Sequence, residues 1–238
     1  MRRAATIRIV IQGASRKQHR GLLVAFLCGI FFFTLPLKAD EFRQVSHYSV
    51  RLFSFGTFTL DVRTGDIQIT GWDDPHVQIE AEKVVEAGSR RKAASQYKRV
   101  QILLEGRDKR VHLRTLYPPR RPWRPFRGES KLSVNFRIHM PYDSNLILKC
   151  VDGDVRVRGI IGQESLMVNY GDVEIDIPSI DRLQSLRAKT WLGNVQSDLH
   201  GEDSAGFSRK VEFWNPNGTQ DILVKVHMGG IYIFSSGE

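Results

Sequence analysis

The stretch Asp152-Gly153-Asp154-Val155-Arg156-Val157 decides the fold, because it returns eighteen residues later as Tyr170-Gly171-Asp172-Val173-Glu174-Ile175. Glycine tolerates positive φ, aspartate can hydrogen-bond its own backbone, and alternating apolar residues are typical of a strand. The phrase therefore predicts a turn that leads into a β-strand. Related copies begin at Thr64-Gly65-Asp66, Leu192-Gly193-Asn194 and Met228-Gly229-Gly230.

Apolar triplets precede four of these turns: Leu146/Leu148/Cys150, Leu166/Val168/Tyr170, Leu186/Ala188/Thr190 and Val224/Val226/Met228. Their starts lie 20, 20 and 38 residues apart, so the last interval predicts two repeats, with a degenerate one near 207–213. A period near 20 is typical of a stacked β-solenoid, since one repeat cannot bury its apolar face alone. The residues expected to face the interior are Val155, Val157, Val173, Ile175, Ile177, Val195, Ile222 and Ile231.

The alignment of the two glycines in the quoted stretches also places charged residues side by side. Arg156 falls beside Glu174, and Arg158 beside Asp176, on the outward face of adjacent strands. We expect a charge ladder between repeats, in which each pair contributes about 0.2 to 1 kcal/mol.

The chain ahead of these repeats is also rich in predicted strands. The polar segment Gly88 to Arg99 lacks alternation and predicts one short helix. Residues 118–128 hold four prolines and predict an exposed, basic loop, because proline cannot pair in a central strand. The fold class is therefore all-β: a single-stranded β-solenoid with rungs of about 20 residues, preceded by a β-rich section with one helix. Strands of that section are expected at 48–54, 58–63, 66–71, 76–84, 100–105, 110–117 and 132–140.

The N-terminus has the layout of a secretory signal, with a basic region, an uncharged run over 21–37 and a small residue, Ala39, before Asp40. We expect 1–39 to be a signal peptide, with 40–238 as the exported domain. The alternative is an uncleaved anchor formed by 21–37. Either arrangement puts the domain in the periplasm or at the cell surface.

Removal of 1–39 changes the charge balance and the cysteine count. That segment carries seven of the basic residues and no acid, so the formal net charge falls from +9 for the whole chain to about +2 for the rest. A nucleic-acid partner is therefore not expected, because it would require a clustered basic face. Cys28 lies in the removed segment, so Cys150 has no partner for an intrachain disulfide.

A family resemblance rests on Phe136-Arg137-Ile138-His139-Met140-Pro141, then Asn145-Leu146-Ile147-Leu148, then the two quoted Gly-Asp-Val turns. This succession resembles the bacterial putative-adhesin family of exported β-strand-repeat domains, in which a strand ending in proline is followed by Gly-Asp-Ile/Val repeats. The resemblance covers roughly 48–238. It implies an exported β-solenoid and brings no catalytic residues to carry over.

We therefore expect a non-enzymatic envelope or cell-surface interaction scaffold, with no catalytic, cofactor-binding or metal-binding residues and no cofactor. The partner is open: envelope glycan, lipid or another surface protein. The alternative function is a β-helical protein that binds or degrades polysaccharide. For that alternative the best site is the acidic stripe Asp172, Glu174 and Asp176, because carboxylates two apart on a strand lie about 7 Å from each other. The competing interpretation is a solvated face neutralised by Arg156 and Arg158.

Three other features raise binding hypotheses. Arg120 to Arg127 interleaves arginines with Trp123 and Phe126, as a segment that grips an anionic polymer would; the simpler interpretation is a solvated insertion between strands. The C-terminal strand around Ile231–Phe234 is expected to leave an apolar edge, which suggests end-to-end self-association. Tryptophans near turns could form a carbohydrate platform or cap the core: Trp72, Trp191 and Trp214.

Overall fold

The computed structural model describes residues 40–118, 132–199 and 208–236. These residues form an all-β structure, in which fourteen strands join in one hydrogen-bonded sheet beside a single α-helix, α2 (Arg90–Tyr97). The all-β class and the one short helix are therefore confirmed. The predicted signal peptide or anchor in 1–39, and almost all of the predicted loop 118–128, lie outside the described residues.

Strand β1 (Asp40–Thr64) belongs to two layers of the fold. Its first half pairs antiparallel with β3 (His76–Ala87), and its second half pairs parallel with β6 (Asn145–Asp152). The register shifts between Leu52 and Thr57, where Phe55 has a φ of +59°. Positive φ is unusual for a bulky residue, and here it marks the bend by which β1 passes from one layer to the other.

Two further strands and the helix complete this end of the molecule. Strand β5 (Leu132–Pro141) lies between β3 and β2 (Ile67–Trp72), and β4 (Gln101–Leu116) pairs parallel with the second half of β1. Helix α2 follows Ser89, whose side chain accepts a hydrogen bond from the amide of Lys92. At its other end Lys83 donates to the carbonyl of Val100 at 2.7 Å, and this contact holds the helix against β3.

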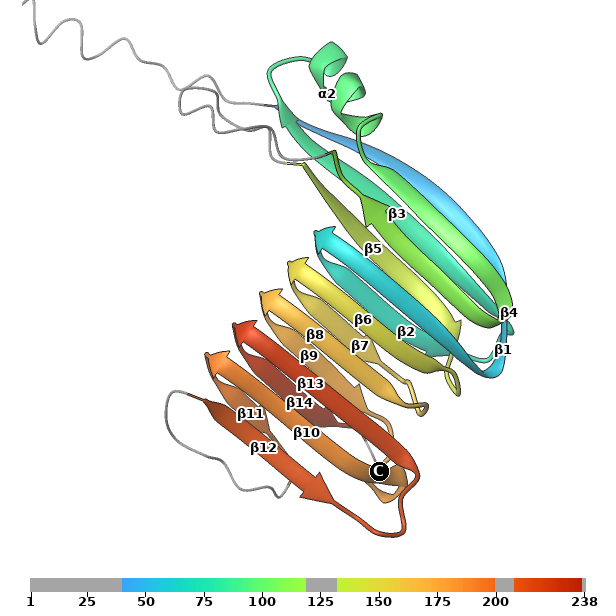
Figure 1. Ribbon diagram of the computed structural model, residues 1–238, viewed down its shortest axis with the longest axis vertical. Coiled ribbons are helices and arrows are strands. Elements are labelled where there is room, and N and C mark those ends of the chain that lie inside the picture. Colours follow the sequence, from blue (N-terminus) through green and yellow to red (C-terminus); the bar gives the residue numbers. More distant parts are fainter. Residues whose placement is uncertain (1–39, 119–131, 200–207, 237–238) are drawn as a thin grey trace, which may run out of the picture. The chain divides into compact units, whose positions relative to one another are not determined.

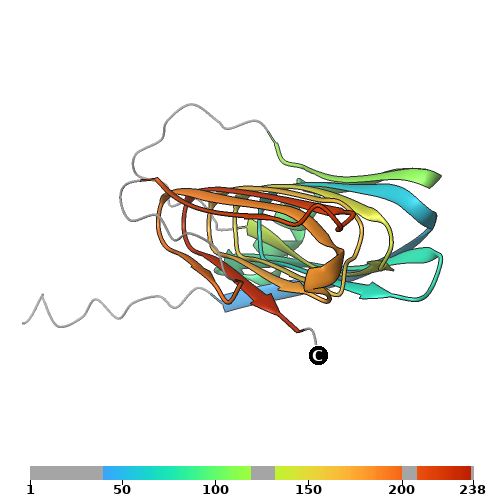
Figure 2. The same cartoon turned by 90° about the horizontal axis from the view of Figure 1, so that it is seen from below.

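The rest of the chain forms short strands that stack in parallel. We call two strands joined by one glycine turn a coil; the five coils are β1 with β2, β6 with β7, β8 with β9, β10 with β11, and β13 with β14. The first strands of the coils lie in layer B, and the second strands lie in layer A (Figures 1 and 2). The bounds of the strands not yet given are β7 (Val155–Arg158), β8 (Glu164–Tyr170), β9 (Val173–Ile177), β10 (Leu183–Leu192), β11 (Val195–Ser197), β12 (Arg209–Trp214), β13 (Gln220–Met228) and β14 (Ile231–Ser235).

The coils do not stack in the order of the sequence. The last coil of the chain, β13 with β14, lies between the β8–β9 coil and the β10–β11 coil and pairs parallel with both (Figure 1). At the other end the first coil, β1 with β2, is likewise flanked on both sides, by β4 and β5 and by β6 and β7. The two coils nearest the chain ends are therefore both interior.

This order corrects two predictions. Strand β14 is paired on both sides, by β9 and by β11, so the expected unpaired edge at Ile231–Phe234 is wrong. The segment near 207–213 is not a degenerate rung: its described part belongs to β12, which pairs antiparallel with β10 at the end of layer B. The interval of 38 residues therefore contains a capping strand rather than a missing repeat.

The interior lies between the two layers and is almost entirely aliphatic. All eight residues expected to face inward are at most 7% exposed, so that prediction is confirmed. The alignment of the triplets is wrong by two residues, because Cys150 lies beside Val168 rather than Tyr170. Tyr170 and Met228 instead lie at exposed strand ends, and the inward position beside Leu146 is taken by Glu164.

Candidate functional site

The outer face of layer A carries paired charges. The Nε atom of Arg156 lies 2.6 Å from Oε2 of Glu174, which confirms the first predicted pair. Arg158 is beside Asp176 in register, as expected, but its guanidinium turns to Oε1 of Glu174 at 2.9 Å. Burial acts to raise the pKa of Glu174, but the Arg158 and Arg156 guanidinium groups outweigh it and hold that pKa below its ordinary value. Glu174 is thus a structural anion held by two cations.

The aspartates of the Gly-Asp turns form a second structural ladder. The Asp66 carboxylate accepts a hydrogen bond from the amide of Asp154 at 3.2 Å, and the Asp154 carboxylate accepts one from the amide of Asp172 at 2.9 Å. Asp172 in turn accepts from the amide of Gly230 at 2.6 Å. These side chains were expected to hydrogen-bond within their own turns, but they bridge successive coils instead.

These contacts occupy two members of the acidic stripe proposed as an active site. Asp172 and Glu174 line a shallow hollow of about 390 Å³ on layer A, together with Arg156 and Tyr232. Among the described residues, no three His, Cys, Asp or Glu side chains gather as a metal site requires. The hollow therefore presents carboxylates that already bind backbone amides and guanidinium groups.

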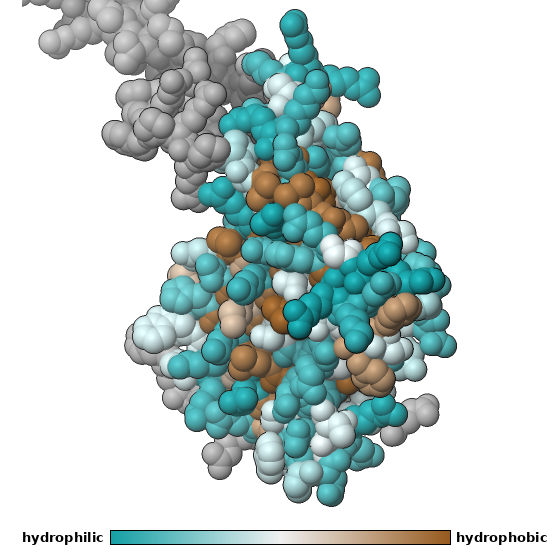
Figure 3. Space-filling view, turned by 45° about the vertical axis from the view of Figure 1, so that its right-hand side comes forward, coloured by the Kyte–Doolittle hydropathy of each residue, from teal (hydrophilic) through white to brown (hydrophobic). Residues whose placement is uncertain are grey.

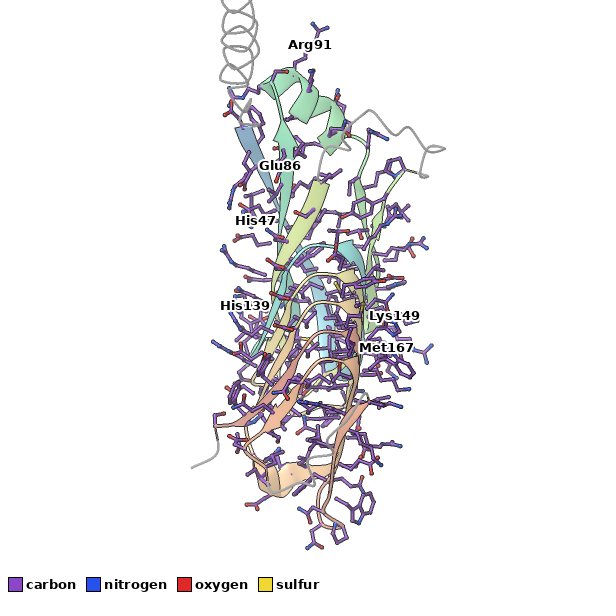
Figure 4. The ribbon with its side chains drawn as sticks, turned by 90° about the vertical axis from the view of Figure 1, so that its left-hand side faces the viewer. His47, Glu86, Arg91, His139, Lys149 and Met167 are labelled. Carbon is purple, nitrogen blue, oxygen red and sulfur yellow. The ribbon has the colours of Figure 1, made fainter. Side chains whose placement is uncertain are left out.

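The outer face of layer B is different, because lysines lie side by side across its strands. In register, Lys225 of β13 lies beside Lys189 of β10, which lies beside Lys210 of β12. On the other side of Lys225 come Met167 and then Lys149. We call the four lysines the lysine row. Figure 4 shows Lys149 and Met167 next to each other on one side of the molecule and His139 on the opposite side.

Within residues 40–118, 132–199 and 208–236, the lysine row has few acids beside it. Neighbouring strands lie about 4.8 Å apart, and like charges directly opposite each other on a sheet are destabilising. Lys189 and Lys225 are exposed and make no ion pair with any described residue. Among the described acids, Asp61 lies next to Lys149, and the carboxylate of Glu212 lies 3.3 Å from Lys210. Sequence analysis missed this row because its members come from four strands that are not consecutive.

The row is bordered by exposed apolar side chains where the strands of layer B end. Tyr170, Met228 and Leu192 lie side by side on β8, β13 and β10 and are 49%, 40% and 47% exposed. Beside them Trp191 is 57% exposed, and its ring stacks on His227 with 6.4 Å between the ring centroids. We call Tyr170, Trp191, Leu192 and Met228 the apolar corner.

The apolar corner is a contiguous group of exposed apolar side chains. Figure 3, which shows part of layer B obliquely, has hydrophilic side chains over much of the molecule and hydrophobic groups gathered mainly below the helical end. Single exposed apolar residues need no explanation, but contiguous ones do.

The tryptophans named in the sequence analysis do not share a surface. Trp72 lies in layer A, where its indole N–H donates to the carbonyl of His76 at 2.8 Å. Trp191 and Trp214 lie at opposite ends of the β10–β12 pair, since Trp214 is beside Ser185. A platform of three tryptophans is therefore wrong. The hypothesis on Arg120–Arg127 falls outside the described residues.

One buried acid was also missed by sequence reasoning. Glu164 points into the interior and accepts a hydrogen bond from the side-chain amide of Gln220 at 3.2 Å, while its other oxygen has no partner. Burial raises the pKa of Glu164 to about 8, and the bond from Gln220 offsets this only in part. The site is closed, so this acid has no access to a substrate.

No protein-family model matches the chain, and no curated protein matches it. Among solved structures, it is similar to a putative cell adhesion protein from Clostridium sporogenes, with 12% identity and a TM-score of 0.49 over 83% of this chain and 100% of that one. It is also similar to putative adhesins from Bacteroides fragilis (12% identity, TM-score 0.23, 80% and 97% covered) and Parabacteroides distasonis (10%, 0.25, 82% and 71%).

These names agree with the family resemblance of the sequence motifs. No helix within the described ranges has the length and apolar character needed to cross a bilayer.

Proposed function

We propose that the chain is an exported, non-enzymatic β-solenoid that serves as an interaction scaffold at the cell envelope or surface, with the outer face of layer B as its contact surface for an anionic partner. The observation that carries the proposal is the contrast between the two layers. Layer A neutralises its arginines with Glu174 and Glu80, whereas layer B places Lys189 and Lys225 side by side without an acid between them.

Such an arrangement costs stability in the isolated protein, since adjacent like charges repel. An anionic partner relieves that repulsion and gains charge-assisted contacts. The parallel stack of coils suits this role, because every coil presents side chains at the same spacing along a rigid surface.

The alternative, a polysaccharide-degrading enzyme, receives less support. Glycoside hydrolysis requires two carboxyl groups that flank the scissile bond, one of which must carry a proton. Glu174 is held ionised by two arginines, and Asp172 binds a backbone amide of the next coil. Glu164 has a raised pKa but is buried. Binding without chemistry is therefore the function that we propose.

The test compares binding of the full chain and two charge-reversal variants to an anionic polysaccharide gel, polygalacturonate, and to anionic vesicles. The double variant Lys189→Glu/Lys225→Glu should lose retention on at least one of them. The matched control is Arg90→Glu/Arg91→Glu, which makes the same change of charge on exposed positions of α2. Equal retention of both variants on both matrices would overturn the proposal.

A further inference from the structure

We propose that the apolar corner docks on the surface of an anionic phospholipid bilayer, with the corner at the boundary of the acyl chains and the lysine row at the level of the headgroups. This inference rests on the proposed function, because it names the anionic partner that the lysine row contacts. Four observations support it: a change in the turn motif, the exposure of the corner, the distance to the lysines and the chemistry of the side chains.

The residue after the turn glycine changes within the apolar corner, between the β8–β9 coil and the two coils beyond it. The first three coils carry an aspartate after the turn glycine, at Asp66, Asp154 and Asp172. In the two coils at the far end of the stack that position is Gly230 or Asn194. Acids therefore disappear from the turns of those two coils, and an anionic surface could approach these turns without the repulsion that the first three would cause.

The residue before the turn glycine also changes along the stack, and this change begins one coil earlier, at Tyr170. It is Thr64 and Asp152 in the first two, Tyr170 in the third, and Met228 and Leu192 in the last two. Register places Tyr170, Met228 and Leu192 side by side on adjacent strands, so their side chains form one continuous ridge. Each is at least 40% exposed. Nothing in the packing of the described residues covers these groups, although burying them would release free energy.

The distances match the depth of a bilayer interface. The ridge residues Met228 and Leu192 follow Lys225 and Lys189 by three positions, or about 10 Å along an extended strand. Interfacial elements bury their apolar face about 5–10 Å into the boundary of headgroups and acyl chains. Lysines at this distance behind the ridge reach the phosphates, and Trp191 lies between the two levels, where tryptophan is favoured.

The side chains favour a bilayer over a polysaccharide. Sugars stack on flat aromatic rings, but Met228 at the centre of the ridge and Leu192 at one end of it offer flexible apolar surface instead. The aromatic rings that could extend a sugar platform, Trp72 and Trp214, lie elsewhere. Aliphatic tips with a tryptophan and a cationic border are typical of interfacial membrane contacts.

Site-specific fluorescence tests the orientation. In the full chain with Cys28→Ser, an environment-sensitive label is placed at Leu192→Cys or, as a control on layer A, at Phe234→Cys, which is 42% exposed. Cys150 does not interfere, because it is buried and burial raises its thiol pKa to about 12. Vesicles of phosphatidylcholine, with and without phosphatidylglycerol, are added to each labelled chain.

We expect the Leu192→Cys label to shift to the blue and to be quenched by spin-labelled lipid on phosphatidylglycerol vesicles, whereas the Phe234→Cys label stays unchanged. Because both chains carry the same residues 1–39, binding through that segment cannot produce the difference. Equal shifts at the two positions, or none at Leu192→Cys, would overturn the bilayer proposal.

Charge reversal provides the second arm. A lysine near an anionic surface contributes about fivefold to partitioning, so Lys189→Glu/Lys225→Glu should lower vesicle binding about 30-fold or more at low salt. Arg90→Glu/Arg91→Glu should retain most of the binding, and circular dichroism verifies that both variants fold. If the chain does not bind vesicles but is retained on polygalacturonate through the two lysines, the bilayer inference is rejected. The proposed function then still stands. If the lysine variant binds vesicles and polygalacturonate as well as the parent does, the bilayer inference and the proposed function are both rejected.

Discussion

Glu164 shows how one residue inside the coils affects the whole fold. It occupies the position that Leu146 takes in the next coil and Ile222 takes in the coil on the other side. A charged carboxylate there would be costly to bury, so the folded protein keeps it protonated up to a pH of about 8. The unfolded chain releases that proton near the ordinary pKa of 4.5. Between these values the folded state binds one proton more than the unfolded state.

The first prediction concerns the pH dependence that follows. The free energy of unfolding should fall as pH rises from about 5 to 8, by up to about 1.4 kcal/mol per pH unit from this group. Glu164→Gln removes the titration and should flatten the profile, leaving the variant more stable than the parent at pH 8. Urea denaturation at several pH values measures this. Glu212→Gln, at an exposed position, is the control and should leave the slope unchanged; a parent profile that rises over this range contradicts the assignment.

A second residue-scale prediction concerns Glu174. Each arginine contact is partly exposed, so each should contribute about 0.2 to 1 kcal/mol. Arg156→Ala and Arg158→Ala should each lower stability by that amount, and each effect should shrink in a Glu174→Gln background. A double-mutant cycle measures the coupling. Effects of the same size in both backgrounds would mean that the arginines act through other contacts.

The sequence predicted the partner of Arg156 correctly, but not the partner of Arg158 or the buried Glu164. Alternation places every second side chain outward, so Arg156 and Glu174 could be paired from the turn glycines alone. It could not decide whether Arg158 turns to Asp176 or to Glu174, because both acids lie within reach of a long side chain. Glu164 was missed because a pattern of apolar residues gives no weight to an acid that burial keeps neutral.

At the scale of the element, the glycine turns explain why the coils lie so close. Gly229 has a φ of +144°, and a Cβ atom there would lie 2.0 Å from the carbonyl oxygen of Gly171. Gly171 has the same relation to Gly153, and Gly153 to Gly65. The glycines therefore form a column in which each backbone contacts the next, and no larger residue fits without separating the coils.

Substitution in this column should be far more costly than at an ordinary glycine. Gly229→Ala combines a severe clash with an unfavourable φ, and we expect a loss of stability of about 3 kcal/mol or more. Gly88→Ala is the matched control, since a Cβ there meets nothing within 4 Å; we expect a change within about 0.5 kcal/mol. Thermal unfolding of both variants gives the comparison, and a tolerated Gly229→Ala would contradict the close packing.

At the scale of the whole molecule, the order of the coils was beyond the reach of the sequence. The strand pattern predicted the coils and their turns, since both depend on local alternation and on glycine. The position of β13–β14 between β8–β9 and β10–β11 depends on long-range pairing. The inward sides of all these strands are similarly aliphatic, so the pattern alone favours no order of stacking. A sequential stack was the simpler expectation, and it was wrong for the last coil, β13 with β14.

Removal of the last coil distinguishes a sequential stack from the stacking order of this structure. In a sequential stack, removal of 219–238 would cost only the last coil. Here it removes the strands between β8 and β10 and between β9 and β11, so the β10–β11 coil and β12 lose their attachment as well. We expect the truncated chain to lose cooperative unfolding and to be cleaved by protease near 183–214. A truncated chain that still protects this region would contradict the interior position of the last coil.

The interior position of the last coil also affects how the protein is made. A chain that emerges from its N-terminus cannot complete the structure step by step, because the β10–β11 coil cannot join the stack until residues 220–235 have been made. Completion is therefore a late and single event. A product that lacks residues 220–235 would not merely be smaller; it would lack the strands that join the β10–β11 coil to the β8–β9 coil.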